Sequence, residues 1–181
     1  MSADTSYDVA ICGAGPVGMT AGLLLAAQGL TVIVLERRST TSNEPKAISI
    51  DDEALRVYQQ AGVVDRVLPI VVPGTGTRYF DSNDEPAFHG GAAIPYRLGY
   101  PFKNPFAQPD LERVLLSALQ DSPSATVRFD TEVTSISQHA DAVELVAGGP
   151  LPLRPVSPGV RRRPVDGPLP PRHRDDRTEP P

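Results

Sequence analysis

The fold is decided by residues 7–18, YDVAICGAGPVG, in which a short apolar run meets three glycines. Residues 7–12 have the length and composition of a buried strand, and residues 19–28 form a helix-forming stretch that a glycine closes. Residues 30–35 are again apolar and rich in β-branched side chains, and the charged Glu36 follows them. This order of strand, tight turn, helix and strand predicts an α/β fold that opens with a Rossmann-type βαβ unit.

Each glycine of the turn has a physical role if the turn binds a dinucleotide. Gly13 permits the tight turn, Gly15 lets a pyrophosphate approach the backbone, and Gly18 lets the helix and the strand pack closely. The pyrophosphate would lie at the helix N-terminus, where unpaired N–H groups and the helix dipole favour negative charge. The predicted contacts of this turn are Gly13, Ala14, Gly15, Pro16, Val17 and Gly18.

Glu36 stands at the end of the second predicted strand. Dinucleotide sites place an acid here to accept hydrogen bonds from the adenosine ribose hydroxyls. Its charge would repel a 2′-phosphate, which argues against NADP in this groove. The alternative interpretation of Glu36 alone is a solvated charge at a strand end.

Beyond the βαβ unit, the sequence predicts two more helices and several short strands. Residues 51–61 have the pattern of an amphipathic helix, capped by acids, with Leu55 and Tyr58 facing inward. A further helix, with Asp110 as a possible N-cap, is expected at residues 110–119. Prolines and glycines crowd the segment between these helices, which predicts irregular connections with short strands. The strands expected after the last helix are residues 126–129, 132–137 and 142–146.

Composition narrows the function classes. The 181 residues carry a net charge of −5, so the folded part offers no broad attraction for nucleic acid or an anionic membrane. The single cysteine, Cys12, excludes an intramolecular disulfide and is interpreted as a small buried strand residue, and three scattered histidines give no metal-ligand spacing. The acidic N-terminus and the interrupted apolar stretch argue against a secretory signal and a membrane span. We therefore expect a cytoplasmic protein without a metal, membrane or nucleic-acid partner.

Residues 150–181 differ in kind from residues 1–149. They are rich in proline and arginine and contain no phenylalanine, tyrosine or tryptophan, so they have too little apolar surface to offset the entropy of ordering. We expect a folded domain at residues 1–149 and a disordered tail at residues 150–181. The alternative is a nucleic-acid-binding arm around residues 161–163. Acidic residues among the arginines and the lack of aromatic side chains to stack on bases weaken it.

A family resemblance begins with DVAICGAGPVG at residues 8–18 and VLER at residues 34–37, which look like the opening of flavoprotein monooxygenases that hydroxylate aromatic rings. More specifically, PKAISIDDEALR at residues 45–56 resembles the 3-(3-hydroxyphenyl)propionate hydroxylase branch. In that branch a basic residue before alanine contacts the flavin nucleotide, so the resemblance implies that Lys46 is a contact, together with Arg37 of the VLER run. The family usually has arginine in place of Lys46. Lysine offers one compact charge, which implies less directional binding than a guanidinium fork.

The resemblance extends to FAQPDLE at residues 106–112, where the family places a glutamine that reaches the cofactor. It implies that Gln108 contacts FAD, although a polar residue before a helix is an equally sound interpretation. The sequence shows no nucleophile together with a base and a third residue to orient that base, so no catalytic residue is predicted. This fits flavin chemistry, in which the cofactor transfers oxygen and the protein supplies placement and electrostatics.

The resemblance covers residue 7 to about residue 147, so it makes residues 1–149 the N-terminal portion of an FAD-binding domain. It implies FAD as the cofactor, and NAD(P)H and an aromatic substrate as partners of a full-length relative. The family's later Asp-Gly motif and substrate domain are missing from this sequence, so we expect a truncated chain. A catalytically inactive FAD-binding fragment is one alternative. A nicotinamide-dependent dehydrogenase is another, but it leaves Lys46 and Gln108 unexplained.

The tail suggests a one-base frameshift near the codons for Gly148 and Gly149. A codon read one base later joins the last two bases of one codon to the first base of the next, which leaves about four choices per position. Residues 154–161 can then encode Ala-Arg-Tyr-Leu-Leu-Gly-Cys, and residues 161–169 can continue as Asp-Gly-Gly-Arg-Ser-Thr-Val-Arg. This string looks like the family's missing motif. We therefore expect either a lesion of the gene or a sequencing error at this point.

Overall fold

The chain opens with a βαβ unit, as predicted. The computed structural model describes residues 7–91, 94–138, 143–148 and 150–152. β1 (Val9–Cys12) leads into α1 (Pro16–Ala27), and β2 (Val32–Leu35) runs parallel to β1. β7 (Ala125–Arg128) lies parallel on the other side of β2 and completes a sheet of order β1-β2-β7. The predicted α/β fold class is confirmed.

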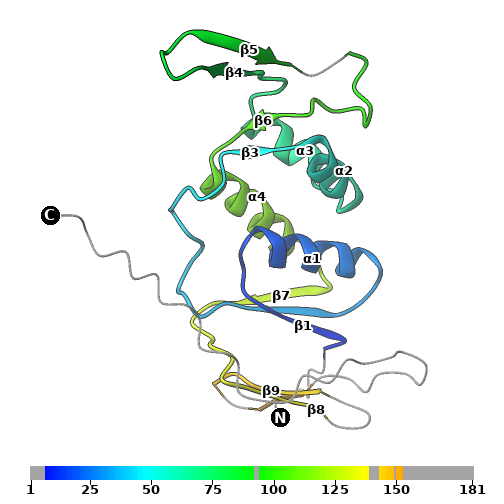
Figure 1. Cartoon of the computed structure of the whole chain (residues 1–181). Helices are drawn as coiled ribbons and strands as arrows, with labels where there is room; N and C mark the ends of the chain where they lie inside the picture. The colour runs from blue at the N-terminus through cyan, green and yellow to red at the C-terminus, as the bar shows by residue number, and fades with distance from the viewer. Residues whose placement is uncertain (1–6, 92–93, 139–142, 149, 153–181) are drawn as a thin grey trace, which may run out of the picture.

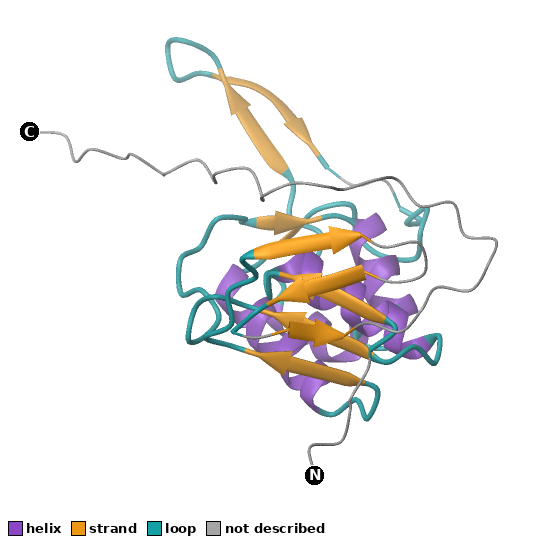
Figure 2. Ribbon diagram, turned by 90° about the horizontal axis from the view of Figure 1, so that it is seen from below, coloured by secondary structure: helices purple, strands orange, loops and turns teal. Residues whose placement is uncertain are grey.

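The elements form three layers, of which this sheet is the middle one (Figures 1 and 2). On one face lie α1 and α4 (Gln108–Gln120), with α2 (Asp52–Gln60) and α3 (Val64–Val67) packed beyond them. The other face is covered by an antiparallel sheet of order β10-β9-β8. The strands of this second sheet are β8 (Ser135–Gln138), β9 (Val143–Val146) and β10 (Pro150–Pro152).

The side chains of β2 alternate between the two faces of the sheet, which explains why both faces are covered. Val32 and Val34 are buried in an apolar cluster with the helices, whereas Ile33 and Leu35 are buried in a second cluster with Leu145 of β9. Successive side chains of a strand point to opposite faces of its sheet. The uninterrupted apolar run of β2 is therefore what a central strand buried on both faces requires.

The segment between α2 and α4 is irregular with short strands, as predicted. A hairpin projects from the body of the molecule (Figure 1), and the rings of Tyr79 and Phe88 stack across it with centroids 4.2 Å apart. Strand β6 (Asn104–Pro105) of this segment pairs antiparallel with β3 (Ser49–Ile50), which precedes α2, and the pair lies beside α3. The segment also contains the 3-10 helix η1 (Leu68–Ile70), and the strands of the hairpin are β4 (Thr77–Phe80) and β5 (Pro86–Gly90).

Two helices begin earlier than predicted. α1 begins at Pro16 because Gly15 takes an extended conformation as its N-cap, and the first turn of a helix does not need the N–H that proline lacks. α4 begins at Gln108 with Ala107 as its N-cap, so the expectation that Asp110 caps this helix is wrong. Asp110 lies in the first turn, where the helix dipole favours its charge.

Helix α2 agrees with its prediction. The Asp51 side chain accepts a hydrogen bond from the Ala54 N–H at 2.8 Å and caps the helix, and Leu55 and Tyr58 are buried. β8 starts later than the strand predicted at residues 132–137. The chain turns after β7 at Asp130, whose φ is +52°, before it can pair with β9.

β10 occupies residues that the sequence places in the tail. It pairs antiparallel with β9 after a turn at Gly148, whose φ is +68°. Its prolines obscured the strand because proline cannot donate to a ladder, but β10 is an outer strand of its sheet among the described residues, and proline is tolerated there. The rest of the predicted disordered tail, residues 153–181, lies outside the described residues. The arginine-rich alternative at residues 161–163 lies outside them too.

Candidate functional site

A cleft of about 540 Å³ lies at the carboxyl ends of β1 and β2, beside the N-terminus of α1. Ligands of open α/β sheets bind at this edge. Its walls come from three segments that are distant in sequence: the glycine turn, the stretch after β2 and the start of α4. All ten contacts predicted from the sequence line it, namely Gly13, Ala14, Gly15, Pro16, Val17, Gly18, Glu36, Arg37, Lys46 and Gln108.

The three glycines of the turn meet three different requirements. Gly13 has a φ of +107°, which favours glycine, and its N–H donates to the Leu35 carbonyl at 2.7 Å. A Cβ at Gly18 would collide with the Gly13 carbonyl oxygen, so this position needs glycine for close packing of α1 on the turn. A Cβ at Gly13 or at Gly15 would meet nothing within 4 Å. The backbone at these two positions is therefore open to a ligand.

The Glu36 carboxylate is held by two backbone N–H groups. Its Oε2 accepts from the Ala14 N–H at 2.9 Å, and its Oε1 accepts from the Arg38 N–H at 3.0 Å. The first bond ties the end of β2 to the glycine turn, so one side chain fixes two walls of the cleft. A carboxylate has about four acceptor sites. Acceptor capacity therefore remains for the hydroxyls of a ligand.

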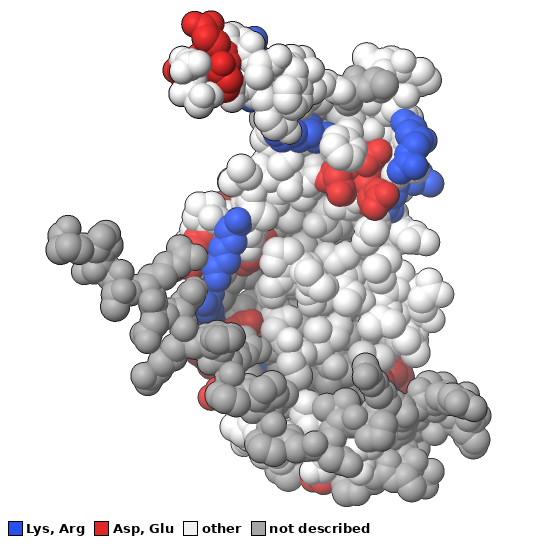
Figure 3. Space-filling model, in the orientation of Figure 1, with Lys and Arg blue, Asp and Glu red and all other residues white. Residues whose placement is uncertain are grey.

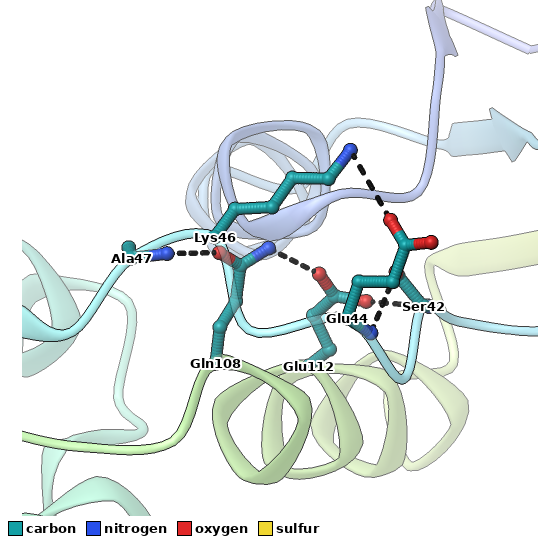
Figure 4. A network of polar contacts seen from close by, with 6 residues as sticks. All are labelled: Ser42, Glu44, Lys46, Ala47, Gln108 and Glu112. Carbon is teal, nitrogen blue, oxygen red and sulfur yellow. Dashed lines mark hydrogen bonds and ion pairs between the residues drawn. The ribbon is translucent and has the colours of Figure 1, made fainter. Parts of the chain in front are cut away.

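The basic residues that line the cleft, Arg37, Arg38 and Lys46, are exposed. Figure 3 shows Lys and Arg side chains, with acidic ones beside them, over the segment that joins β2 to β3. The Lys46 Nζ lies 3.9 Å from the Glu44 carboxylate (Figure 4). An exposed ion pair of this length contributes little. Lys46 can therefore leave Glu44 for a bound anion.

Gln108 contacts the loop that carries Lys46 as well as lining the cleft (Figure 4). Its Oε1 accepts from the Ala47 N–H at 2.8 Å, and its Nε2 donates to Glu112 Oε1 at 2.8 Å. The second carboxylate oxygen of Glu112 accepts from the Ser42 N–H at 2.9 Å. These three bonds attach both ends of the 42–47 loop to the first turns of α4.

The role of Glu112 was not predicted from the sequence. Its spacing from Gln108 is consistent with such a role, because a residue four positions after Gln108 lies on the same face of a helix. The side chain is only 2% exposed, although a glutamate in an amphipathic helix is usually on the surface. The other cleft residues that were not predicted are Ile11, Cys12, Ala21, Arg38, Thr40, Thr41 and Ser42.

Cys12 is exposed and lines the cleft, so the expectation of a buried strand residue is wrong. It ends β1, which is an outer strand of its sheet among the described residues, at the edge where the cleft opens. Within the described part of the chain, no three His, Cys, Asp or Glu side chains are grouped to hold a metal ion. In that same part, no helix is long and apolar enough to cross a membrane.

Residues 6–149 match the family model of the FAD binding domain. The chain belongs to the FAD binding domain family. The match includes all three segments that form the cleft, and it confirms the prediction of FAD as the cofactor. It favours FAD over the nicotinamide cofactor of the dehydrogenase alternative.

Curated relatives carry the name that the resemblance suggested. The chain is 38% identical over 152 residues to a 3-(3-hydroxy-phenyl)propionate/3-hydroxycinnamic acid hydroxylase of Mycobacterium sp. strain JLS, which covers 83% of this chain and 27% of that protein. The hydroxylase of the same name from Escherichia coli strain SMS-3-5 is 37% identical over 140 residues, covering 77% and 25%. The chain thus spans about a quarter of the length of the curated relatives it matches.

Solved structures agree with the fold. The p-nitrophenol 4-monooxygenase PnpA of Pseudomonas putida DLL-E4 superposes with a TM-score of 0.73 and 26% identity, over 82% of this chain and 39% of that one. The flavin-dependent monooxygenase PieE, solved in complex with FAD and substrate, gives a TM-score of 0.69 at 24% identity, over 84% and 29%. The described fold is therefore that of the FAD-binding portion of flavin-dependent monooxygenases.

Proposed function

We propose that the cleft binds FAD with the pyrophosphate at the N-terminus of α1 and the adenosine ribose at Glu36. The observation that carries this proposal is the convergence of all ten sequence-predicted contacts on one cleft. The glycine turn fits the cofactor, because a Cβ at Gly13 or Gly15 would occupy the space through which a pyrophosphate approaches the backbone. N–H groups of the first helical turn then donate to the anion.

The other contacts supply charge and hydrogen bonds. Arg37 and Lys46 place positive charge at the mouth of the cleft, and Gln108 offers a side-chain amide. Glu36 accepts from ribose hydroxyls and repels a 2′-phosphate, which favours FAD over NADP. FMN lacks the adenosine ribose altogether, so the cleft should prefer FAD to FMN.

In a longer protein of the relatives' kind, this portion would serve the hydroxylation of a phenolic aromatic substrate with NAD(P)H and O₂ in the cytoplasm. FAD, when bound, supplies the oxygen-transfer chemistry. The residues of this chain bind and orient the cofactor, and we assign none of those that the structure describes a catalytic role. A catalytically inactive FAD-binding fragment is the second candidate, since the match covers only 27% of the first relative.

Flavin titration of the purified chain tests the proposal. We expect tighter binding of FAD than of FMN, measured by flavin fluorescence at matched concentrations. Glu36→Gln removes the charge and one acceptor oxygen, so it should weaken FAD binding by about 1–3 kcal/mol and reduce the preference for FAD over FMN. Glu53→Gln is the matched control, because Glu53 is exposed on α2 and pairs with Arg97. Equal affinities for FAD and FMN would contradict the proposal.

A further inference from the structure

The 42–47 loop, which carries Lys46, is attached to α4 by a buried carboxylate. Glu112 is 2% exposed and Gln108 is 8% exposed, so water has little access to their hydrogen bonds. A buried charge is retained only where its oxygens are satisfied. Here each oxygen of Glu112 has one donor, Ser42 N at 2.9 Å and Gln108 Nε2 at 2.8 Å. Glu112 therefore joins the start of the loop to the side chain that holds the loop's other end.

The carboxylate also decides which way the Gln108 amide faces. An ionised carboxylate only accepts hydrogen bonds, so the group that Gln108 turns toward Glu112 must be its NH₂. The carbonyl oxygen of the amide must then face the Ala47 N–H, a donor, as it does at 2.8 Å. If the amide were flipped, its oxygen would face the Glu112 carboxylate and its NH₂ would face the Ala47 N–H. Glu112 and Ala47 together therefore allow only one orientation in which both hydrogen bonds form.

This orientation sets what Gln108 offers to the cleft. An amide NH₂ has two N–H donors, and Glu112 takes one of them. The second N–H belongs to a side chain that lines the cleft, where a phosphate or flavin oxygen needs a donor. We propose that Glu112 is a positioning residue, which holds the Lys46 loop against α4 and makes Gln108 a hydrogen-bond donor toward FAD. This inference rests on the proposed function.

Limited trypsin digestion of the full chain, without FAD, tests the attachment of the loop. The Lys46–Ala47 bond lies in the loop, and the Arg78–Tyr79 bond in the exposed hairpin is an internal reference. Glu112→Gln keeps the size of the side chain but has one acceptor oxygen for two donors, so one of the three bonds is lost. We expect cleavage after Lys46 to become about tenfold faster relative to the reference bond. Glu53→Gln should change neither rate.

A double variant that exchanges the side chains of Gln108 and Glu112 distinguishes the attachment of the 42–47 loop from the orientation of the Gln108 donor. In Gln108→Glu/Glu112→Gln, the new carboxylate at position 108 can accept from Ala47 and from the new amide, and the amide oxygen can accept from Ser42. All three bonds are restored, but position 108 now presents a negative charge and no donor to the cleft. We expect trypsin resistance within about twofold of the wild type, while FAD binding stays at least about tenfold weaker.

Each outcome decides the proposal. The proposal that Glu112 attaches the loop would be overturned by unchanged cleavage after Lys46 in Glu112→Gln. It would also be overturned if the double variant were cleaved there as fast as Glu112→Gln. A double variant that binds FAD as tightly as the wild type would overturn the donor role. Absence of FAD binding by the wild type would overturn the proposed function and the donor role with it. The digestion without FAD would still decide whether Glu112 holds the loop.

Discussion

Gly15 and Gly18 belong to one turn but face different surroundings. At Gly18 a Cβ would collide with the Gly13 carbonyl, which is backbone and cannot rotate away. At Gly15 a Cβ would enter open space, and the φ of −79° is ordinary for any residue. One methyl group should therefore affect folding at the first position and ligand binding at the second.

Alanine at each position tests this difference. Gly18→Ala should lower the free energy of unfolding by about 1–3 kcal/mol, the usual cost of overpacking. Gly15→Ala should change it by less than about 1 kcal/mol, because N-cap preference and chain entropy partly cancel. It should nevertheless weaken FAD binding by about tenfold or more. Urea unfolding and flavin titration give the two values. A stable Gly18→Ala protein would show that the turn can shift.

At the scale of elements, Tyr58 connects helices α1 and α2. Burial raises the pKa of Tyr58 above its ordinary value of 10.0, and a hydrogen bond with Thr20 of α1 lowers it in part. The nearby charge of Asp51 adds to the rise. The folded protein therefore holds the phenolic proton more tightly than the unfolded chain does.

The sign of this shift predicts weaker stability in alkali. The shifted pKa of Tyr58 contributes to the free energy of unfolding. This contribution is fully present below pH 10 and is lost as the pH rises through the raised pKa, because the unfolded chain releases the proton first. Tyr58→Phe removes the titrating group, so its stability should fall less than that of the wild type between pH 9 and about pH 11. Urea unfolding of both proteins across this range measures the difference. Parallel pH profiles would contradict the assignment.

At the scale of the whole molecule, the parallel sheet is covered on both faces. Helices bury one side of β2, and the β8-β9-β10 sheet buries the other. The family match ends at residue 149, next to β10 and close to the proposed frameshift. The end of the family match and the change in composition thus coincide at residues 149–150.

The frameshift proposal predicts a specific result from resequencing the gene. An inserted or deleted base near the codons for Gly148 and Gly149 should restore a frame that reads Asp-Gly at residues 161–163 and continues as an open frame. The recovered chain should also bind FAD more tightly than the present one in the same titration. A shifted frame without Asp-Gly, or with an early stop codon, would show the proposal to be wrong.

The resemblance to flavoprotein monooxygenases implied the identity of the cofactor. Residue patterns alone predicted the βαβ unit, the glycine turn and the inward face of α2. These features depend on local chemistry: periodicity, turn geometry and a motif whose residues are close together in the chain. Gly13, Gly18 and Leu55 behave as expected because their requirements arise within a few residues or from simple burial. The α/β fold class follows from the same signals.

Three features depend on packing between distant parts of the chain: the position of Glu112, the exposure of Cys12 and the strand β10. The hydrogen bond from Ser42 to Glu112 joins residues 70 positions apart, and no local pattern reports such a partner. Cys12 is exposed because β1 is an outer strand among the described residues, and β10 tolerates proline for the same reason. Whether a strand lies at the edge of a sheet depends on strand order, which is set by packing across the molecule.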